Sequence, residues 1–360
     1  MAAFPVVAFE GANLYAWGVT AALTDFSTPD LERAFKADGL EPFRARQVHT
    51  WIYKHRATDF SRMTDLSRDL RLRIGRAYRV VGSKIVRRAR ARDGVEKLLV
   101  RLADGNVIET VLIPEARRRT ACISTQVGCP VACVFCASGL DGLKRNLTAG
   151  EIVEQLLHLP EKPTHVVVMG IGEPLANLRA LLPAVATLNE KGGFGLSARG
   201  ITISTVGLPE KMRELAAVGK PYNLAVSLHA ATDDLRSEML PINKKYPLKV
   251  LFPACRDYVA KTKRRITFEW ALIQGKNDTP AQAQALVKLL TQPKLLCHVN
   301  VIPLNPTRDY AGAASTRERV AAFKAILEAG GVPCTVRVRR GIDINAGCGQ
   351  LRVAAMADNG

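Results

Sequence analysis

The sequence has no apolar run near the roughly 20 residues that a membrane-spanning helix needs, and it has no low-complexity tract. Its opening, MAAFPVVAFEGANLYAWG, has no charged segment ahead of the apolar residues, so we expect no secretory signal. Eight cysteines in 360 residues are far too few for a disulfide scaffold. We therefore expect a cytoplasmic protein with no membrane partner, in which clustered thiols serve a metal or a reaction.

Acidic residues are scarce relative to basic ones. The chain has 33 Asp and Glu against 51 Lys and Arg, which gives a formal net charge of +18. A basic surface is common in soluble proteins, but here the positive charge is clustered, and clustered charge favours a polyanion, most often a nucleic acid. The clusters are residues 87–92, 117–119, 261–265 and 337–340.

Residues 1–82 are predicted to form a small helical domain. Thr28 and Pro29 are expected to be the N-cap and first residue of a helix that ends at Gly39. PFRARQVHTWIYKHRA has apolar residues at helical spacing with a basic opposite face, and SRMTDLSRDLRLRIG is predicted to be a third helix.

Residues 83–115 are predicted to be a β-rich connection. The runs SKIVRRARA, KLLVRLA and NVIETVLIP are separated by Asp93-Gly94 and Asp104-Gly105. Both dipeptides are strong signals for hairpin turns, so we expect antiparallel strands in this segment.

Residues 116–360 alternate between strand-like and helical runs. Capping residues Thr148 and Glu151 are predicted to begin one helix, and Ser315 and Glu318 another that ends at Gly330-Gly331. Six continuous apolar strands with helices between them predict an α/β fold with a buried parallel sheet, an open partial (β/α)6 barrel. Functional residues should lie at the carboxyl ends of its strands. The strand runs are TACISTQV, THVVVMG, GITISTVG, YNLAVSLHA, RITFEWALI and LLCHVNVIP.

Three cysteines, Cys129, Cys133 and Cys136, lie on one short loop directly after the first of these strands. At C-x3-C-x2-C spacing their sulfurs can converge, and they can hold three corners of a [4Fe–4S] cluster. The spacing differs from the paired C-x2-C knuckles of zinc sites, and a ferredoxin-type cluster would need a fourth cysteine. No fourth cysteine follows within reach, so the fourth iron needs another ligand. Cys255, Cys297 and Cys334 lie in apolar surroundings and are predicted to be core residues.

This cysteine loop after the first strand of a partial barrel resembles the radical S-adenosylmethionine (SAM) superfamily. Within it, six motifs follow in the order found in the RlmN/Cfr methyltransferases: TACISTQVGCPVACVFCASGLDGLKRNLTAGEIVEQ, VVVMGIGEPLAN, ITISTVG, LAVSLHA, VIPLNP and DINAGCGQL. PFRARQVHTWIYKHRATDFSRMTDLSRDLR also resembles the helical RNA-binding domain of RlmN. The resemblance covers nearly the whole chain.

The resemblance implies one [4Fe–4S] cluster on Cys129, Cys133 and Cys136, with SAM as the fourth ligand. It implies two SAM per turnover, one as methyl donor and one that is cleaved by an electron from the cluster to a 5′-deoxyadenosyl radical. Cys348 would carry the methyl group and form the bond to the RNA base. Cys122 would release the product by a transient disulfide with Cys348, and Glu109 would accept the ring proton.

The resemblance also implies SAM contacts at the strand ends. By composition alone, His229 would more often be a core histidine, but its place in the string Ser227-Leu228-His229 favours a role at the site. His158, His165 and His298 are expected to be structural. The implied SAM contacts are Gly172, Glu173, Ser204, Ser227, Leu228, His229 and Asn305.

The implied reaction is methylation of carbon 2 of an adenosine in 23S ribosomal RNA, at the peptidyl transferase centre, and of an adenosine beside the tRNA anticodon. An external donor such as a flavodoxin-type reductant would supply electrons. A Cfr-type enzyme that methylates carbon 8 uses the same cysteines, so no spacing separates the two. A third hypothesis is an iron–sulfur redox or RNA-binding protein without transferase activity, in which Cys348 and Cys122 are dispensable.

Overall fold

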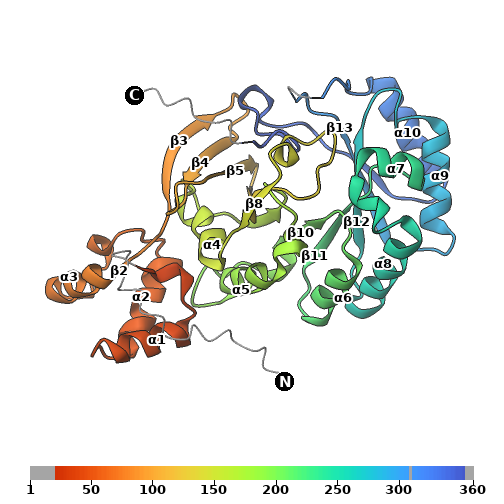
Figure 1. Cartoon of the computed structure of the whole chain (residues 1–360). Helices are drawn as coiled ribbons and strands as arrows, with labels where there is room; N and C mark the ends of the chain where they lie inside the picture. The colour runs from red at the N-terminus through yellow and green to blue at the C-terminus, as the bar shows by residue number, and fades with distance from the viewer. Residues whose placement is uncertain (1–20, 308–309, 353–360) are drawn as a thin grey trace.

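The core of the protein is one mixed ten-stranded sheet, which the computed structural model describes within residues 21–307 and 310–352 (Figure 1). Its strand order is β14-β13-β12-β11-β10-β9-β6-β5-β4-β3. The strands are β3 Lys84–Arg90, β4 Glu96–Arg101, β5 Val107–Glu115, β6 Arg118–Cys122, β9 His165–Val168, β10 Ile201–Thr205, β11 Asn223–Ser227, β12 Ile266–Leu272, β13 Cys297–Pro303 and β14 Cys334–Val336.

The part of the sheet from β6 to β14 is parallel throughout, and helices follow its strands along the outer side. The predicted open (β/α)6 barrel is confirmed. β14 adds a seventh parallel strand, which has only three residues and was not among the predicted strands. The helices are α1 Thr28–Ala37, α2 Phe43–Tyr53, α3 Arg68–Ala77, α4 Ala149–His158, α5 Leu178–Asn189, α6 Pro209–Ala217, α7 Asp233–Met239, α8 Leu248–Thr262, α9 Pro280–Thr291 and α10 Arg317–Ala329.

The β-rich segment before the barrel is an extension of the same sheet. β3, β4 and β5 pair antiparallel, and β5 pairs antiparallel with β6. Gly94 and Gly105, at φ +85° and +86°, form the two predicted hairpin turns. The segment thus widens the barrel sheet by three strands. The predicted domain boundaries at residues 82 and 115 stay predictions. Residues on both sides of each boundary belong to one hydrophobic core.

The first predicted strand, TACISTQV, is divided into two. β6 pairs with β9 as far as Cys122, after which the Gln155 side chain takes over the backbone groups of Ser124, accepting from its N–H and donating to its carbonyl at 2.8 Å each. The chain then turns into β7 (Gln126–Gly128), which pairs with β8 (Leu143–Asn146) in a separate two-stranded sheet. This break moves the cysteine loop off the barrel sheet.

Two helix caps lie one residue away from their predicted positions. Ser27, rather than Thr28, caps α1, and Thr316, rather than Ser315, caps α10. The Ser315 hydroxyl instead donates to Asp278 at 2.7 Å, so a long-range contact takes it away from the helix.

The other predicted helix ends are confirmed. Thr148 and Glu151 form a reciprocal capping box at the start of α4. Gly330 is the C-cap of α10, and Gly39 follows the C-cap of α1 with φ +68°.

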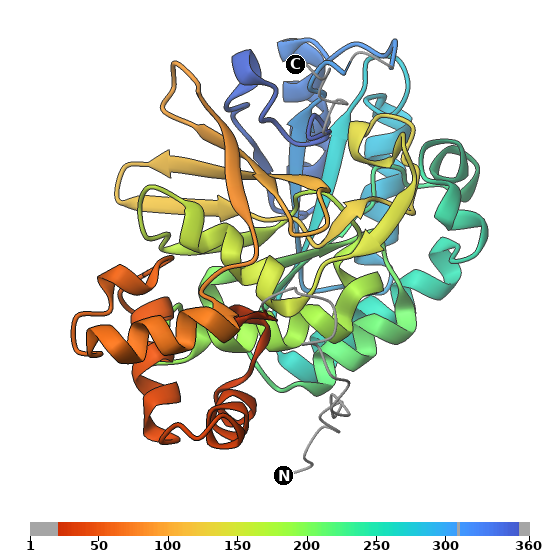
Figure 2. The ribbon, with the colours of Figure 1, turned by 60° about the vertical axis from the view of Figure 1, so that its left-hand side comes forward.

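Helices α1–α3 gather outside the ring of barrel helices, as the red and orange ribbons of Figures 1 and 2 show. A short parallel pair, β1 (Ala21–Ala22) with β2 (Tyr78–Arg79), closes this helical group. Its apolar side chains, such as Leu31 and Phe35, belong to the same contiguous hydrophobic core as the barrel. The group is therefore packed on the barrel rather than tethered to it. Among the described residues, none of the helices is long and apolar enough to cross a bilayer.

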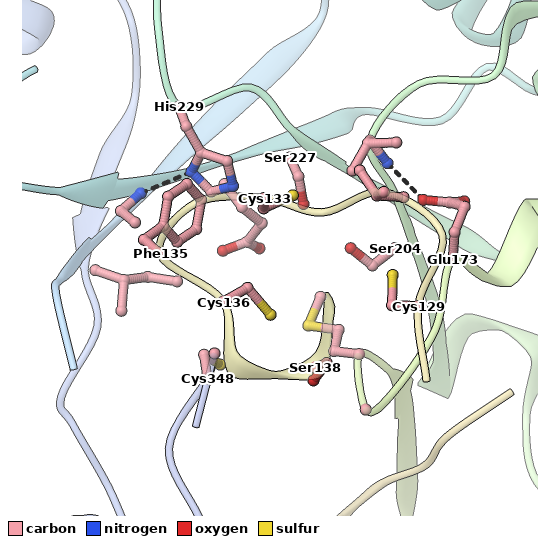
Figure 3. A pocket seen from close by; sticks show the side chains of 18 of the residues that line it. Cys129, Cys133, Phe135, Cys136, Ser138, Glu173, Ser204, Ser227, His229 and Cys348 are labelled. Carbon is pink, nitrogen blue, oxygen red and sulfur yellow. Dashed lines mark hydrogen bonds between the residues drawn. The ribbon is translucent and has the colours of Figure 1, made fainter. Parts of the chain in front are cut away.

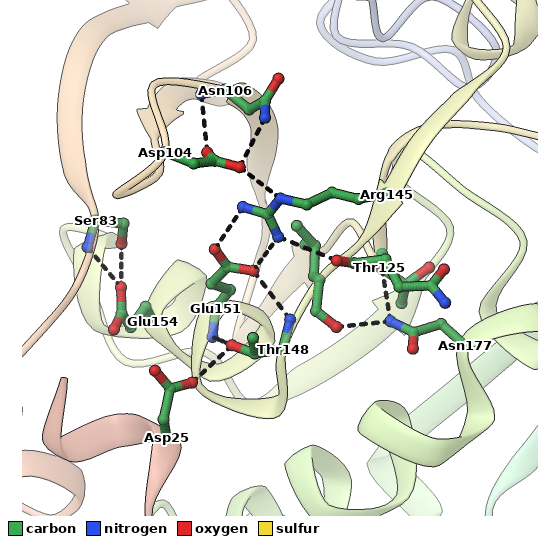
Figure 4. Close-up of polar contacts among 12 residues, drawn as sticks. Asp25, Ser83, Asp104, Asn106, Thr125, Arg145, Thr148, Glu151, Glu154 and Asn177 are labelled. Atoms are coloured by element: carbon green, nitrogen blue, oxygen red, sulfur yellow. Dashed lines mark hydrogen bonds and ion pairs between the residues drawn. The ribbon is translucent and has the colours of Figure 1, made fainter. Parts of the chain in front are cut away.

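The amino end of α4 joins three parts of the chain (Figure 4). Arg145 of β8 pairs with Glu151 of α4 at 2.7 Å and with Asp104 of the β4–β5 turn at 2.6 Å. The hydroxyl of Thr148 donates to Asp25, which precedes α1, at 2.7 Å. The helical group, the antiparallel extension and the β7–β8 hairpin are thus held at one point.

One turn further along α4, Glu154 is buried and accepts hydrogen bonds from four donors. They are the backbone N–H groups of Gly82 and Ser83, at 2.7 and 2.8 Å, and the hydroxyls of Ser83 and Thr24. This carboxylate joins the end of the helical group to the barrel. If a buried donor loses such an acceptor, the free energy spent on removing it from water is no longer offset by a hydrogen bond.

We expect Glu154→Ala to lower the free energy of unfolding by about 2–4 kcal/mol, because it leaves several buried donors unpaired. Denaturant titration of the holoenzyme measures this. Glu161→Ala is the matched control: this carboxylate is exposed and pairs with Arg119 at 3.4 Å, so its loss should change stability by less than about 0.5 kcal/mol. Equal effects of the two substitutions would contradict the assignment.

Candidate active site

A pocket opens at the carboxyl ends of the parallel strands, where parallel-sheet enzymes place their chemistry (Figure 3). The cysteine loop covers one side of it, and strand ends from β9 to β13 form the other. Ten of the sequence-predicted site residues line it: Cys129, Cys133, Cys136, Gly172, Glu173, Ser204, Ser227, His229, Asn305 and Cys348.

The cysteine loop begins at the β7–β8 hairpin. Gly128 is at φ +77°, and a Cβ there would lie 1.9 Å from the carbonyl oxygen of Gly142, so only glycine allows the two strands to meet. The N–H of Cys129 donates to that same carbonyl at 3.0 Å, and the N–H of Cys136 donates to the carbonyl of Cys133 at 3.1 Å. Local backbone contacts thus shape the loop.

The loop thiols lie in apolar surroundings, packed against residues such as Val131, Phe135 and Leu304. Burial raises the pKa of Cys129 to about 12 and that of Cys133 well above its usual value, and their mutual repulsion adds to both. Three thiols that resist ionisation need a strongly positive partner before they become thiolates, and iron supplies that charge.

The spacing predicted that the three sulfurs converge, but in the structure they lie around the cavity and do not meet at one point (Figure 3). In the part of the chain that the structure describes, no three His, Cys, Asp or Glu side chains are grouped as ligands for a metal ion. A [4Fe–4S] cluster binds each thiolate at a different iron, so separated sulfurs around one cavity fit a cluster and do not fit tetrahedral zinc.

Glu173 presents a carboxylate at the pocket from the turn after β9. Gly172 before it has φ +111°, and a Cβ there would lie 2.8 Å from the Gln126 side chain. The Glu173 carboxylate accepts from the N–H groups of Leu175 at 3.0 Å and Val206 at 2.8 Å. Burial raises its pKa to about 7, so a bound ammonium group would restore its charge. The contact of Glu173 with the methionine end of SAM stays a prediction, and a buried carboxylate at the pocket is compatible with it.

His229 follows β11 at φ +59° and packs edge-on against Phe135, with ring centroids 4.9 Å apart. Its Nδ1 accepts from the N–H of Ala271 at 2.9 Å. Burial lowers its pKa to about 3, with a further effect from the Arg236 guanidinium. The ring is therefore neutral and carries its proton on Nε2, where it can donate to a ligand.

Two buried acceptors at the pocket have no hydrogen-bond partner among the described residues. They are Oδ1 of Asn305 and Oε2 of Glu269. The Nδ2 of Asn305 donates to the carbonyl of Cys348 at 2.9 Å, which leaves Oδ1 for a ligand. Unpaired buried acceptors are costly, so the pocket fits a ligand with several donors, such as the amino and hydroxyl groups of SAM.

The loop that carries Cys348 is fastened to the cysteine loop. The N–H of Ala137 donates to the carbonyl of Gly349 at 2.8 Å, and the Ser138 hydroxyl donates to the carbonyl of Leu351 at 2.7 Å. Figure 3 shows Cys348 at the same cavity as the three loop cysteines. The structure thus brings together thiols that lie more than 200 positions apart in the sequence.

Glu109 and Cys122 do not line the pocket but lie directly beside it. The β5–β6 register pairs Val111 with Cys122, so Glu109, two residues from Val111, is on the same face of the sheet as Cys122. Burial raises the pKa of Cys122 to about 12, and repulsion from the Cys348 sulfur adds to the shift. The two thiols are therefore near neighbours.

Leu228 differs from the other predicted residues. Its side chain is fully buried in the main core and does not line the pocket. Its backbone N–H donates to the carbonyl of Glu269 at 3.1 Å, which continues the pairing of β11 with β12. The predicted core cysteines, Cys255, Cys297 and Cys334, are all buried, as expected.

Sequence reasoning missed three charged residues at the site. Glu269 and Arg337 line the pocket, with Arg337 Nη1 at 3.7 Å from Glu269 Oε2. Arg236 is fully buried and donates to the carbonyls of Val206, at 2.7 Å, and Leu228, at 3.2 Å, which join the ends of β10 and β11. An acidic residue within the apolar run RITFEWALI could have indicated Glu269. Arg337 was identified in the sequence only as part of a basic cluster.

Comparison with protein-family models identifies the class of the barrel. Residues 123–286 match the radical SAM superfamily, and residues 21–80 match the ribosomal RNA large subunit methyltransferase N-terminal domain. The fold and the three-cysteine pocket therefore define a radical SAM protein.

Whole-chain relatives are more specific. The chain is 45% identical to a probable dual-specificity RNA methyltransferase RlmN of Rhodopirellula baltica over 92% of its length and 90% of the relative's, and 44% identical to one of Chloroflexus aurantiacus, at 91% and 92% coverage. It superposes on the crystal structure of a radical SAM methyltransferase from Sphaerobacter thermophilus with a TM-score of 0.89, at 45% identity, covering 92% and 99% of the two chains. The chain belongs to the RlmN family of radical SAM dual-specificity RNA methyltransferases, as its motifs predicted.

We expect Cys133→Ala to abolish cluster binding, because two thiolates cannot hold three iron corners. Iron and sulfide content and the visible absorbance after anaerobic reconstitution measure the loss. Cys255→Ala makes the same chemical change at a fully buried thiol on α8 and should retain the cluster. A brown, active Cys133→Ala enzyme would overturn the ligand assignment.

Proposed function

We propose that the protein methylates carbon 2 of an adenosine at the peptidyl transferase centre of 23S ribosomal RNA, and also an adenosine beside the tRNA anticodon. Family membership supports RNA methylation with SAM and an iron–sulfur cluster. The match of residues 21–80 to the ribosomal RNA large subunit methyltransferase N-terminal domain favours carbon 2 over the Cfr-type activity. The observation that carries the cysteine mechanism is the attachment of the Cys348 loop to the cluster loop through Ala137 and Ser138. This attachment supports a thiol that acts next to the cluster.

Cys129, Cys133 and Cys136 would hold three irons of one [4Fe–4S] cluster, and the amino and carboxylate groups of SAM would bind the fourth. Glu173 would accept a hydrogen bond from the SAM amino group, and His229 Nε2 would donate one. The other proposed SAM contacts at the pocket are Gly172, Ser204, Ser227 and Asn305. Leu228, the remaining proposed contact, would act from behind the pocket, since its side chain belongs to the core.

Carbon 2 of adenine is electron-poor, so it cannot attack the methyl group of SAM directly. Cys348, which is exposed, would first take a methyl group from one SAM. When bound, the cluster and a second SAM supply the 5′-deoxyadenosyl radical that removes a hydrogen from this S-methyl group. The Cys348 methylene carbon then bonds to carbon 2, which joins protein and RNA covalently.

Glu109 and Cys122 would release the product. The ring C–H bond would break as its proton passes to a Glu109 oxygen, and the unpaired electron that the radical addition leaves on the ring would return to the oxidised cluster. The Cys122 thiol would then lose its proton and its sulfur would bond to the Cys348 sulfur, while the S–CH2 bond breaks and the electron pair of that bond moves to the methylene carbon. That carbon takes up a proton to become the methyl group, and the two cysteines remain as a disulfide.

Exposed arginines on the edge strand β3, namely Arg87, Arg88 and Arg90, support RNA as the partner, as does the helical group that matches the methyltransferase N-terminal domain. We place the reaction in the cytoplasm, with a flavodoxin-type reductant as the external electron donor.

The nucleosides formed when unmodified 23S RNA is treated anaerobically with reduced holoenzyme and SAM test this function. Chromatography with mass analysis should detect 2-methyladenosine. Formation of 8-methyladenosine would show a Cfr-type activity instead, with the same roles for the cysteines. No methylated adenosine, from enzyme that carries its cluster, would favour a redox or RNA-binding protein without transferase activity.

We expect Cys122→Ala to accumulate enzyme covalently joined to RNA, because the variant lacks the thiol that takes over the Cys348 sulfur. Denaturing gels with labelled RNA measure the trapped fraction. Cys334→Ala, a buried thiol at the far edge of the sheet, is the control and should turn over normally. Normal turnover of Cys122→Ala with no trapped species would refute the releasing role.

A further inference from the structure

Lys97 is a lysine in a place where lysine is rare. It lies on β4, in the middle of the antiparallel extension, and is 9% exposed. Its Nζ is 2.8 Å from Oε1 of Glu109, which is 2% exposed. The second carboxylate oxygen, Oε2, is buried and has no hydrogen-bond partner among the described residues. Lys97 therefore holds one oxygen, and the other has no partner at hydrogen-bond geometry, while the backbone N–H of Arg352 is close enough to the carboxyl to lower its pKa.

Lys97 also reaches the loop that carries Cys348. Its Nζ donates to the carbonyl of Asn345 at 3.1 Å, three residues before Cys348. Asn345 is at φ +52°, a left-handed backbone conformation that fixes the direction of its carbonyl group. One ammonium group thus contacts both the proposed proton acceptor and the loop of the proposed methyl carrier.

The strand registers show that this arrangement belongs to one face of the sheet. Lys97 pairs with Val111 across β4 and β5, and Val111 pairs with Cys122 across β5 and β6. Lys97, Glu109 and Cys122 therefore lie on the same face. Apolar residues of the Cys348 loop, Ala346 and Leu351 among them, cover that face in a cluster with Val111 and Cys122.

The same loop is anchored to the β3–β4 turn by two further hydrogen bonds. The N–H of Gly341 donates to Asp93 Oδ2 at 2.9 Å, and the N–H of Arg92 donates to Asp343 Oδ2 at 3.1 Å. The loop thus has anchors that do not involve Lys97. Lys97 differs from them because it also brings a positive charge to Glu109.

We propose that Lys97 is a positioning residue for product release: it keeps the Glu109 carboxylate ionised, directs its free oxygen toward the substrate carbon, and sets its position relative to Cys348. This inference rests on the proposed role of Glu109 as proton acceptor. Stability alone is a weak reason for a buried ion pair, because well-packed apolar residues often replace such pairs without loss.

The charges around Glu109 determine the direction of the effect. Burial raises the pKa of Glu109, and Lys97 is the facing cation that lowers it, with a smaller contribution from the backbone N–H of Arg352. From β6 the facing group is Cys122, which is neutral because burial raises its pKa to about 12. The Arg352 guanidinium is paired with Asp141 at 3.1 Å. Removal of Lys97 therefore raises the pKa of Glu109, so a smaller fraction of this carboxyl is in its basic form at a given pH.

The test uses reconstituted holoenzyme with Lys97→Met, which keeps length and removes the charge, and Lys97→Arg, which keeps the charge. Lys97→Met should methylate Cys348 normally, because that step does not need Glu109, and should then accumulate the covalent RNA adduct. Adduct release at pH 7 should be at least about tenfold slower than in the unchanged enzyme, since each unit of pKa reduces the ionised fraction about tenfold. Lys97→Arg should restore part of the release rate.

The pH dependence separates a positioning role from a merely structural one. Release from the Lys97→Met adduct should become faster as the pH rises, because a larger fraction of Glu109 is then ionised. The rate of release from the Glu109→Gln adduct should depend on pH only through Cys122. The difference between the pH profiles of the two variants therefore measures the ionisation of Glu109. Lys324→Met, which removes an ion-paired lysine from α10, is the control and should behave as the unchanged enzyme.

Two results would overturn the inference. One is a Lys97→Met enzyme that releases product at the normal rate at pH 7. The other is a variant whose cluster content and Cys348 methylation fall in proportion to its activity, with no adduct and no recovery at high pH. Failure of the proposed function is distinguishable, because Glu109→Gln would then turn over without any adduct.

Discussion

The antiparallel pairing of β5 with β6 is the constraint on which the reaction site depends. It joins the three-strand extension to the parallel barrel, and its register places Val111 opposite Cys122. Because side chains alternate along a strand, a shift of one residue would turn Glu109 away from Cys122 and expose a carboxylate to the opposite, apolar face. The same register sets the place of Lys97 one strand further out. The family's radical barrel thus becomes a methyltransferase site only with this extension attached.

Electrostatics divides the site into two parts. In the pocket, burial raises the pKa of the cluster thiols and of Glu173, so these groups are neutral or half-charged until a positive partner binds. Iron and the SAM cation supply that charge, and protein and ligands become mutually dependent. Beside the pocket, the protein provides its own cation to Glu109, in the form of Lys97. In the proposed reaction Glu109 accepts a proton from carbon, and the facing Lys97 favours the ionised carboxylate that this step needs.

The Cys348 loop connects the two parts. On one side Ala137 and Ser138 bind it to the cluster loop, and on the other Asp93 and Lys97 bind it to the antiparallel extension. Cys348 therefore lies on a loop held between the three-cysteine loop and the Lys97–Glu109 pair. These four hydrogen bonds use main-chain atoms of the loop, so none of them occupies the Cys348 side chain.

The sequence alone determined the parts whose signals are local. The C-x3-C-x2-C spacing, the alternating strands and helices, the capping box at Thr148 and the turns at Gly94 and Gly105 depend on residues close together in the chain, and the structure has the corresponding loop, barrel, cap and hairpins. Tertiary structure decided where the first strand breaks, because the side chain of Gln155 forms the hydrogen bonds of the Ser124 backbone in place of a neighbouring strand. It also decided which partners Glu269, Arg236 and Lys97 contact. A charged residue in an apolar strand has the same sequence signal whether it faces solvent or a partner. Only the pairing of strands far apart in the chain brings that partner within hydrogen-bonding distance, and so decides between the two.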